Sequence, residues 1–418
     1  MSVALTSLAP LRHQSFALAI TSSFVSSIGT WMQNVALGIY LTETTRNPIW
    51  LGLLTVSAWT PAIIGSPLGG VVADRWSRQR WIQLNNLMMT GTASALAVAA
   101  VTHHLSPALA CYLAVGEGLC GSASWAAWQS LLPDLVEKDE VLAAVSLSSA
   151  QFNLGRVIGP IFAALALTFG SVSLCFAINA ASFFFVLVIF SFVRSAPRPK
   201  PTTRVHFIAE TITGARQAWA VKGCRHPILG VGVVAVIAGP FIALVPAMAI
   251  IVLHAGKIGT TWLVSAQGVG AVVGALTLPT VAKRTSRLKV LRGSIYVLAG
   301  SLALYAEAPN LASSVVVMVV LGGAYMGTMT GLNTSVQLHA PRAERSRILA
   351  LYILSLSMFY PLGAFVQSDL AKSFGVRPVT LVAAGVLILV LVVVRIFSPD
   401  YWLAMGTPPI QAPILLAD

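Results

Sequence analysis

Long apolar stretches alternate with short polar ones along the whole chain. An α-helix needs about 20 residues to cross the hydrocarbon core of a bilayer, and twelve apolar stretches have roughly this length. Backbone polar groups inside lipid must find partners within their own segment, so we predict helices and not strands. The expected spans cover residues 16–41, 50–73, 81–101, 107–131, 141–168, 171–193, 227–253, 259–281, 289–306, 311–338, 347–371 and 376–397.

The longest polar interruption between spans, residues 194–226, divides the pattern into two sets of six segments. We therefore predict an all-α membrane protein with a six-helix bundle over 1–193, a basic linker over 194–226, a second bundle over 227–397 and a tail over 398–418. Within the linker, residues 209–221 suit an amphipathic helix lying on an anionic membrane surface, and a plain basic tether is the alternative.

The two sets carry traces of an internal repeat. The pattern Gln-x-x-x-Pro begins at Gln129 and recurs at Gln337, near the end of the fourth segment of each set. A Phe-Gly pair that begins at Phe169 recurs at Phe374, at the end of the fifth segment of each set. Two such bundles packed face to face form the architecture of a rocking transporter whose site lies near the midplane.

Composition supports a membrane protein and excludes several other classes. The chain has 418 residues, of which 56% are hydrophobic and 9% charged, and a soluble chain of this size carries far more charge. The net charge of +13 does not indicate nucleic-acid binding, because the basic residues occupy short loops and not one soluble face. We expect the partners to be the lipid bilayer and a small-molecule substrate, and the protein to be a monomer.

The distribution of basic residues predicts the orientation. Of the 26 Lys and Arg residues, 21 lie on the side of both termini, four lie on the opposite side and Arg156 lies inside a span. Short cytoplasmic loops are enriched in Lys and Arg, so we expect both termini in the cytoplasm. No cleavage site follows the first span, which we interpret as an uncleaved helix.

Several kinds of chemistry have no counterpart in the sequence. The four cysteines lack metal or disulfide spacing, and the pair His103-His104 has no third ligand nearby. A Walker A sequence is absent, as is any arrangement of a nucleophile with a base. We therefore expect no enzyme, no metal and no cofactor, with the proton gradient as the energy source.

A charged turn joins the second and third spans. Between Gly70 and Arg80 it contains one acid, Asp74, and three arginines. Arginines suffice to set topology, so the acid needs another explanation. A carboxylate at this position can cap a helix N-terminus and pair with Arg78.

The motif Gly70-x-x-x-Asp74-Arg75-x-Ser77-Arg78-x-Arg80 resembles the loop motif of the major facilitator superfamily, with Ser77 where glycine is usual. The sequence Gly155-Arg-Val-Ile-Gly159-Pro160 resembles a fifth-helix motif that is enriched among exporters of that superfamily. Residues 29–37 and 128–136 resemble its branch of transmembrane secretion effectors, which contains the enterobactin exporter and related drug-efflux proteins.

This resemblance implies a fold of two six-helix bundles and a proton-coupled exporter of a siderophore or drug-like molecule in a bacterial inner membrane. In the family, the loop acid at Asp74, with Arg75 and Arg78 beside it, latches the halves on the cytoplasmic side. Gly155, Gly159 and Pro160 allow close helix approach and a kink. Alternatives on the same scaffold are an importer of an iron chelate or nutrient and a non-transporting receptor or regulator.

Two charges lie deep within apolar spans, Glu117 in the fourth and Arg156 in the fifth. Charges at bilayer depth usually face a cavity, are paired and are functional. Because the two spans are neighbours, the sequence allows a pair of Glu117 with Arg156 and leaves open whether it forms. The pair would couple protons or anchor a charged substrate, and a static structural pair is the alternative.

The resemblance also implies that the first, fourth, seventh and tenth helices line the cavity. Aromatic and amide side chains in these helices suit a large, partly polar organic molecule. Core or lipid-facing packing is the alternative for each residue taken alone. The candidates are Trp31, Gln33, Asn34, Trp125, Tyr325 and Asn333.

Overall fold

A computed structural model describes residues 8–194, 216, 218–341, 344–398 and 400–406, without the side chains of residues 74, 75, 346 and 400. Throughout these residues every regular element is a helix, and helical segments occupy all twelve predicted positions. The expected all-α membrane fold is confirmed. Most of the proposed amphipathic stretch, residues 209–221, lies outside the described residues.

The first half begins with the short η1 (Ala9–Arg12). Its long helices are α2 (Gln14–Thr45), α3 (Ile49–Trp59), α4 (Ala62–Arg75), α5 (Arg78–Val101), α6 (Pro107–Leu131), α7 (Val141–Phe169) and α8 (Val172–Ile189), with η2 (Leu132–Asp134) after α6. The second half contains α10 (Lys222–Ile237), α11 (Phe241–Ala247), η3 (Met248–Val252), α12 (Gly256–Arg284), α13 (Arg287–Glu307), α14 (Leu311–His339), α15 (Arg345–Phe374), α16 (Val376–Phe397) and α17 (Asp400–Gly406).

Ten candidate spans in the described residues are long and apolar enough to cross a membrane. The remaining two predicted positions are α2 and α6, which have 32 and 25 residues. These two helices carry Gln33 and Glu117 among other polar residues, which lowers their hydropathy. The structure is therefore consistent with twelve spans.

Two predicted spans are interrupted, which the apolar pattern did not reveal. The second span breaks between α3 and α4 at Pro61. The seventh breaks at Pro240, and its last turn, η3, is a π-helix. Proline has no backbone N–H to continue a helix, and π-helical turns are often found at functional sites.

Serine caps two helices at equivalent places in the two halves. Ser77 accepts a hydrogen bond from the backbone N–H of Arg80 at the start of α5. Ser286 accepts one from Lys289 at the start of α13. Such a cap contributes about 1 kcal/mol to a helix. The shared cap supports the internal repeat and explains serine at the position where the loop motif usually has glycine.

The predicted tail contains a helix that packs against the second half. The ring of Tyr401 in α17 stacks on His226 in α10 at 4.6 Å, and its hydroxyl donates to the carbonyl oxygen of His226. Trp402 is only 6% exposed. Residues 400–406 therefore belong to the second bundle.

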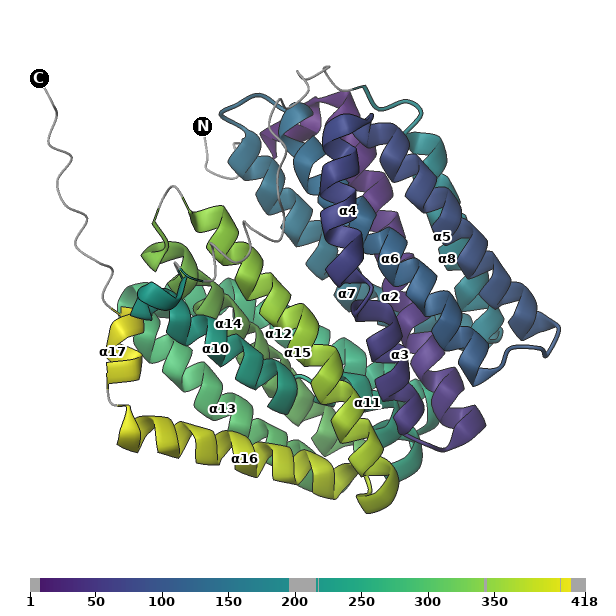
Figure 1. The fold of residues 1–418 in the computed structure, drawn as a ribbon. Coiled ribbons are helices and arrows are strands. Elements are labelled where there is room, and N and C mark those ends of the chain that lie inside the picture. Colours follow the sequence, from purple (N-terminus) through teal and green to yellow (C-terminus); the bar gives the residue numbers. More distant parts are fainter. Residues whose placement is uncertain (1–7, 195–215, 217, 342–343, 399, 407–418) are drawn as a thin grey trace, which may run out of the picture.

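The two halves are separate bundles that meet at one end (Figure 1), where α3, α11 and α15 lie close together. We call this end, at which α2 finishes and α3 begins, the distal side. The opposite end, at which α2 begins and α16 finishes, is the termini side. A Cβ built on Gly52 in α3 would lie 2.8 Å from the Cα of Phe365 in α15, so glycine permits this contact between the halves.

Further contacts join the halves on the distal side. Gly38 of α2 packs against Pro246 of α11, with 2.8 Å between a built Cβ and the proline ring. Lys257 at the start of α12 forms an ion pair with Glu43 near the end of α2, at 3.4 Å. The distal side is consequently closed in this conformation.

Glycines also set the distance between α2 and α7. A Cβ built on Gly155 would lie 2.6 Å from the Cβ of Ser27, and one built on Gly159 would lie 2.5 Å from the Cβ of Trp31. Real side chains do not approach so closely, so α7 can rest against α2 only with glycine at both positions. Pro160 follows within the same helix.

Candidate functional site

A cavity of about 880 Å3 lies between the two halves. It reaches Leu51 and Thr55 near the closed distal side and Ile82 and Phe190 toward the termini side. Ile82 lies one turn after the start of α5, so the cavity extends well toward that side. Polar side chains are scattered in a mainly apolar and aromatic wall, the usual character of a site for organic molecules.

Glu117 of α6 lies in the cavity wall and is held by a chain of buried amides. Gln33 Nε2 of α2 donates to Glu117 Oε2 at 2.5 Å. Asn179 Nδ2 of α8 donates to Gln33 Oε1 at 2.9 Å. Gln33 and Asn179 are both 0% exposed, so water does not compete for these bonds. The chain directs an N–H donor at the carboxyl group.

The other carboxyl oxygen has a partner that can either donate or accept. The hydroxyl of Thr92 in α5 donates to Glu117 Oε1 at 3.3 Å and to the carbonyl oxygen of Met89 at 3.0 Å. A hydroxyl has one hydrogen and can serve these acceptors only in turn. When the hydrogen points to Met89, the hydroxyl oxygen can accept a bond from a protonated Glu117. Both protonation states of Glu117 therefore have satisfactory partners.

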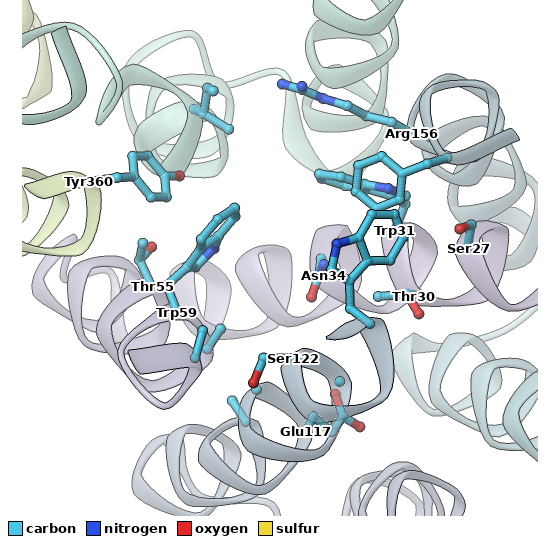
Figure 2. A pocket seen from close by; sticks show the side chains of 18 of the residues that line it. Ser27, Thr30, Trp31, Asn34, Thr55, Trp59, Glu117, Ser122, Arg156 and Tyr360 are labelled. Atoms are coloured by element: carbon cyan, nitrogen blue, oxygen red, sulfur yellow. The ribbon is translucent and has the colours of Figure 1, made fainter. Parts of the chain in front are cut away.

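Arg156 of α7 extends into the cavity over the face of Trp31, with 5.4 Å between the guanidinium carbon and the ring centroid. Figure 2 shows its side chain directed toward the side of the cavity where Tyr360 lies. The phenol groups of Tyr325 and Tyr360 in the second half are within electrostatic range. Across the described residues, no carboxylate forms an ion pair with this guanidinium.

Aromatic rings form the wall beside Arg156. Phe152 contacts Trp31 edge-on at 6.1 Å and Trp125 at 5.4 Å between ring centroids. Phe152 is 38% exposed and Trp125 41% exposed, and both line the cavity. Three helices, α2, α6 and α7, thus present one aromatic surface to whatever the cavity binds.

A second aromatic pair joins the two halves. Trp59 of α3 and Tyr360 of α15 meet edge-on at 5.2 Å, and both line the cavity. Trp59 is the last residue of α3 before the break at Pro61, and Tyr360 packs beside Gly239 at the break before α11. The pair therefore joins the two places where helices are interrupted.

The structure places most of the predicted cavity residues in the wall. Trp31, Asn34, Trp125, Tyr325 and Asn333 all line the cavity. The prediction for Gln33 was wrong, because this side chain is fully buried behind the wall and orients Glu117.

Glu117 and Arg156 do not pair, which answers a question that the sequence left open. Glu117 is bonded to uncharged partners, and Arg156 lies against Trp31. Figure 2 shows the two charged groups on opposite sides of the cavity, with Trp31 and Asn34 between them. Counting helical steps gives the face of each helix on which a residue lies, but not the rotation of one helix against its neighbour.

The charged turn has a described partner inside the first half. Arg78 Nη1 donates to Asp134 Oδ2 at 2.5 Å and to the carbonyl oxygen of Ser130 at 3.1 Å. The side chains of Asp74 and Arg75 lie outside the described residues, and the latch remains a prediction. A Cβ built on Gly70 would meet nothing within 4 Å, so no close packing requires this glycine.

Several residues of the site were missed from the sequence. Thr92 and Asn179 are ordinary helix residues by pattern, and no signal distinguishes them. Trp59 precedes the break at Pro61, and Tyr360 precedes Pro361, which lies inside the continuous helix α15. The sequence therefore held no common signal for this pair.

The arrangement suits the binding and release of a molecule and not the making or breaking of its covalent bonds. Among the described residues no group of three or more His, Cys, Asp and Glu side chains comes together that could hold a metal ion. One carboxyl group can exchange a proton, one guanidinium can receive an anionic group, and aromatic faces can receive rings. All three face one cavity between two bundles that are in contact only in part.

Two six-helix halves around a central cavity that is closed on one side define a multi-pass membrane transporter. The chain belongs to the transmembrane secretion effector family of the major facilitator superfamily, whose model matches residues 5–401. Members of this superfamily are transporters of small molecules and not enzymes.

Related proteins agree with this assignment. The enterobactin exporter EntS of Shigella boydii is 27% identical over 411 residues, covering 92% of this chain and 94% of the relative. EntS of Escherichia coli is 27% identical over 409 residues with the same coverage.

Solved structures share the fold. A variant of the nucleoside transporter NupG aligns with a TM-score of 0.76 at 15% identity, covering 94% of this chain and 100% of that one. A bacterial homolog of the human lysosomal transporter Spinster, in an inward-facing and unoccupied conformation, aligns with a TM-score of 0.71 at 14% identity, covering 95% and 97%.

Proposed function

We propose that this protein is a proton-coupled secondary active exporter that moves a small organic molecule, a siderophore or drug-like metabolite, out of the cytoplasm by alternating access. It would lie in a bacterial inner membrane with both termini in the cytoplasm. The Lys and Arg distribution supports this orientation. The names of the relatives, which are exporters, support the direction.

The observation that carries the proposal is the environment of Glu117. This carboxyl group faces the cavity and is held by Gln33 and Thr92, and no cationic side chain among the described residues pairs with it. A charge near the middle of a membrane helix costs about 2.5–3.5 kcal/mol on insertion scales, so a carboxyl group without a counter-charge gains by binding a proton. Thr92 accommodates either state, as a coupling group requires.

The shape of the cavity fits the loading step of export. With the termini in the cytoplasm, the closed distal side faces outward and the cavity extends toward the cytoplasm, where the substrate is. Export then requires the Glu43–Lys257 ion pair and the Gly52–Phe365 contact to separate on the outer side. The breaks at Pro61 and Pro240 interrupt the second and seventh spans, which meet at the closed side, and supply places where the helices can bend.

Deletion of the gene tests transport and identifies the cargo together. Mass spectrometry of medium and cell extract should find a compound that accumulates inside the deletion strain and disappears from its medium. The opposite distribution would indicate an importer. If no compound changes its distribution under iron-limited or drug-exposed growth, the transport proposal fails.

Glu117→Gln tests the coupling. The new amide copies a protonated carboxyl, because its oxygen accepts from Gln33 and its N–H donates to Thr92, so the fold should be preserved. We expect normal amounts of protein in the membrane and loss of export against a gradient. Glu307→Gln, at an exposed position at the end of α13, is the matched control and should restore export in the deletion strain. Equal export by both variants would contradict proton coupling through Glu117.

A further inference from the structure

Arg156 presents a positive charge to the cavity that the described residues leave uncompensated. Its only close described partner is the face of Trp31, at 5.4 Å. None of the ion pairs formed by the described residues includes it. A cation–π contact lowers the energy of a guanidinium but supplies no counter-charge. An isolated charge in a membrane interior is unfavourable, and proteins retain one where it has a function.

Glu117, the acid in the neighbouring span, does not neutralise this charge. Glu117 is bound by Gln33 and Thr92, and it lies across the cavity from Arg156 (Figure 2). In the second half, the phenols of Tyr325 and Tyr360 lie close enough to act electrostatically on Arg156. A phenol is neutral at physiological pH and can donate a hydrogen bond to an anion.

We propose that Arg156 binds a negatively charged group of the substrate, and that the transported molecule is an organic anion carrying an aromatic ring. The inference rests on the proposed transport function. A guanidinium presents donors in a planar fork that matches a carboxylate or a similar planar anion. An anionic group would supply the counter-charge that the described residues do not provide, with Tyr325 and Tyr360 as further donors.

The aromatic part of the proposal comes from the wall beside the guanidinium. Trp31, Phe152 and Trp125 form a continuous ring surface that is open to the cavity. A flat ring bound there would stack on these side chains while its anionic substituent reached Arg156. A neutral substrate would leave Arg156 uncompensated, and a cationic one would be repelled by it. The site therefore selects both charge and shape.

The test measures binding of three naphthalene probes that share one ring system and carry a negative, a neutral or a positive substituent. Purified full-length protein in lipid nanodiscs is titrated with 2-naphthoate, 2-naphthamide and 2-naphthylmethylamine, by calorimetry and without any proton gradient. Charge-assisted hydrogen bonds are the strong ones, so we expect the carboxylate to bind at least about tenfold more tightly than the amide, and the amine to bind most weakly. Equal affinities for carboxylate and amide, tighter amine binding or no carboxylate binding would overturn the proposal.

Variants then assign the discrimination to one residue. Arg156→Gln should lose the preference for carboxylate and keep its affinity for the amide, whereas Arg156→Lys should keep a weaker preference because lysine lacks the planar fork. Arg46→Gln, at an exposed arginine on the distal side, should behave like the wild type. An unchanged preference in Arg156→Gln would overturn the assignment. Even if Arg156→Gln does not fold, the wild-type probe series tests whether the cavity prefers an anion.

The binding test and the transport test can fail independently of each other. If the deletion strain shows no change in any exported compound but carboxylate binding depends on Arg156, the proposed function fails and the anion site stands. If export is observed and the cargo is neutral or cationic, the proposed function stands and the anion site is overturned.

Discussion

Asn179 determines which end of the Gln33 amide faces Glu117. Because Asn179 donates to Gln33 Oε1 at 2.9 Å, the Nε2 group of Gln33 must point at Glu117, where it donates at 2.5 Å. Both amides are fully buried, so no water restores the bond if one is removed. A donor held in this way favours the ionised carboxylate. Asn179→Leu keeps the branched shape of the side chain and removes the bond that orients Gln33.

The expected size follows from the geometry. In Asn179→Leu the amide of Gln33 can turn over and present Oε1, which bonds only to a protonated Glu117. A hydrogen bond to a charged group contributes about 1.5–3 kcal/mol, and one pH unit corresponds to about 1.4 kcal/mol. The midpoint for protonation of Glu117 should therefore move to higher pH by about 1–2 pH units.

Infrared difference spectroscopy measures this midpoint without knowledge of the substrate. The protein in nanodiscs is titrated with acid while the carboxyl C=O band is followed, and the band missing in Glu117→Gln belongs to Glu117. Ser173→Ala, in the same helix, is the control, because the hydroxyl of Ser173 bonds to Ser171 and not to the chain that holds Glu117. A midpoint that stays constant in Asn179→Leu, or moves to lower pH, would refute the orienting role of Asn179.

Two further predictions concern packing. Gly159→Ala places a Cβ 2.5 Å from the Cβ of Trp31 in α2 and should destabilise the protein by about 1–3 kcal/mol, as overpacking does. Gly70→Ala is its control, because the new Cβ meets nothing within 4 Å and thermal unfolding should not change. Asp134→Ala removes the mostly buried ion pair that Asp134 forms with Arg78 at 2.5 Å, and should cost about 3 kcal/mol in the unfolding free energy. Asp139→Ala, at an exposed position, is its control. Equal melting temperatures for Gly159→Ala and Gly70→Ala would contradict the packing argument, and equal ones for Asp134→Ala and Asp139→Ala would contradict the role of the ion pair.

The positions of the helices were predictable because their signal is local. A stretch of about 20 apolar residues bounded by charge has few alternatives to a membrane helix. Thr60-Pro61 and Gly239-Pro240 lie inside such stretches, and mean hydropathy does not register them. The breaks follow from the missing N–H of proline, which the sequence does contain. Pro160, Pro279 and Pro361 nevertheless lie inside continuous helices, so a proline alone does not predict where a span breaks.

The charges of the site were predictable, but their partners were not. Glu117 and Arg156 are conspicuous because a charge in an apolar span is unusual. Their partners depend on how α2, α6, α7 and α8 are rotated against one another, and packing over the whole bundle sets that rotation. Gln33 illustrates the limit, since it is one residue from the cavity stripe yet points away from the cavity to hold Glu117.

The separation of the two charges has an energetic consequence for the proposed cycle. If Glu117 and Arg156 were paired, each would neutralise the other, and neither a proton nor an anion would be needed to complete the site. Held apart, they act as two sites. Outward movement of an anion is favoured by an inside-negative potential by about 2.3 kcal/mol per charge at 100 mV, and inward movement of a proton adds about the same amount. Exchange of one anion for one proton would thus gain this free energy for two charges. Exchange of a neutral substrate for one proton would gain it for one charge only.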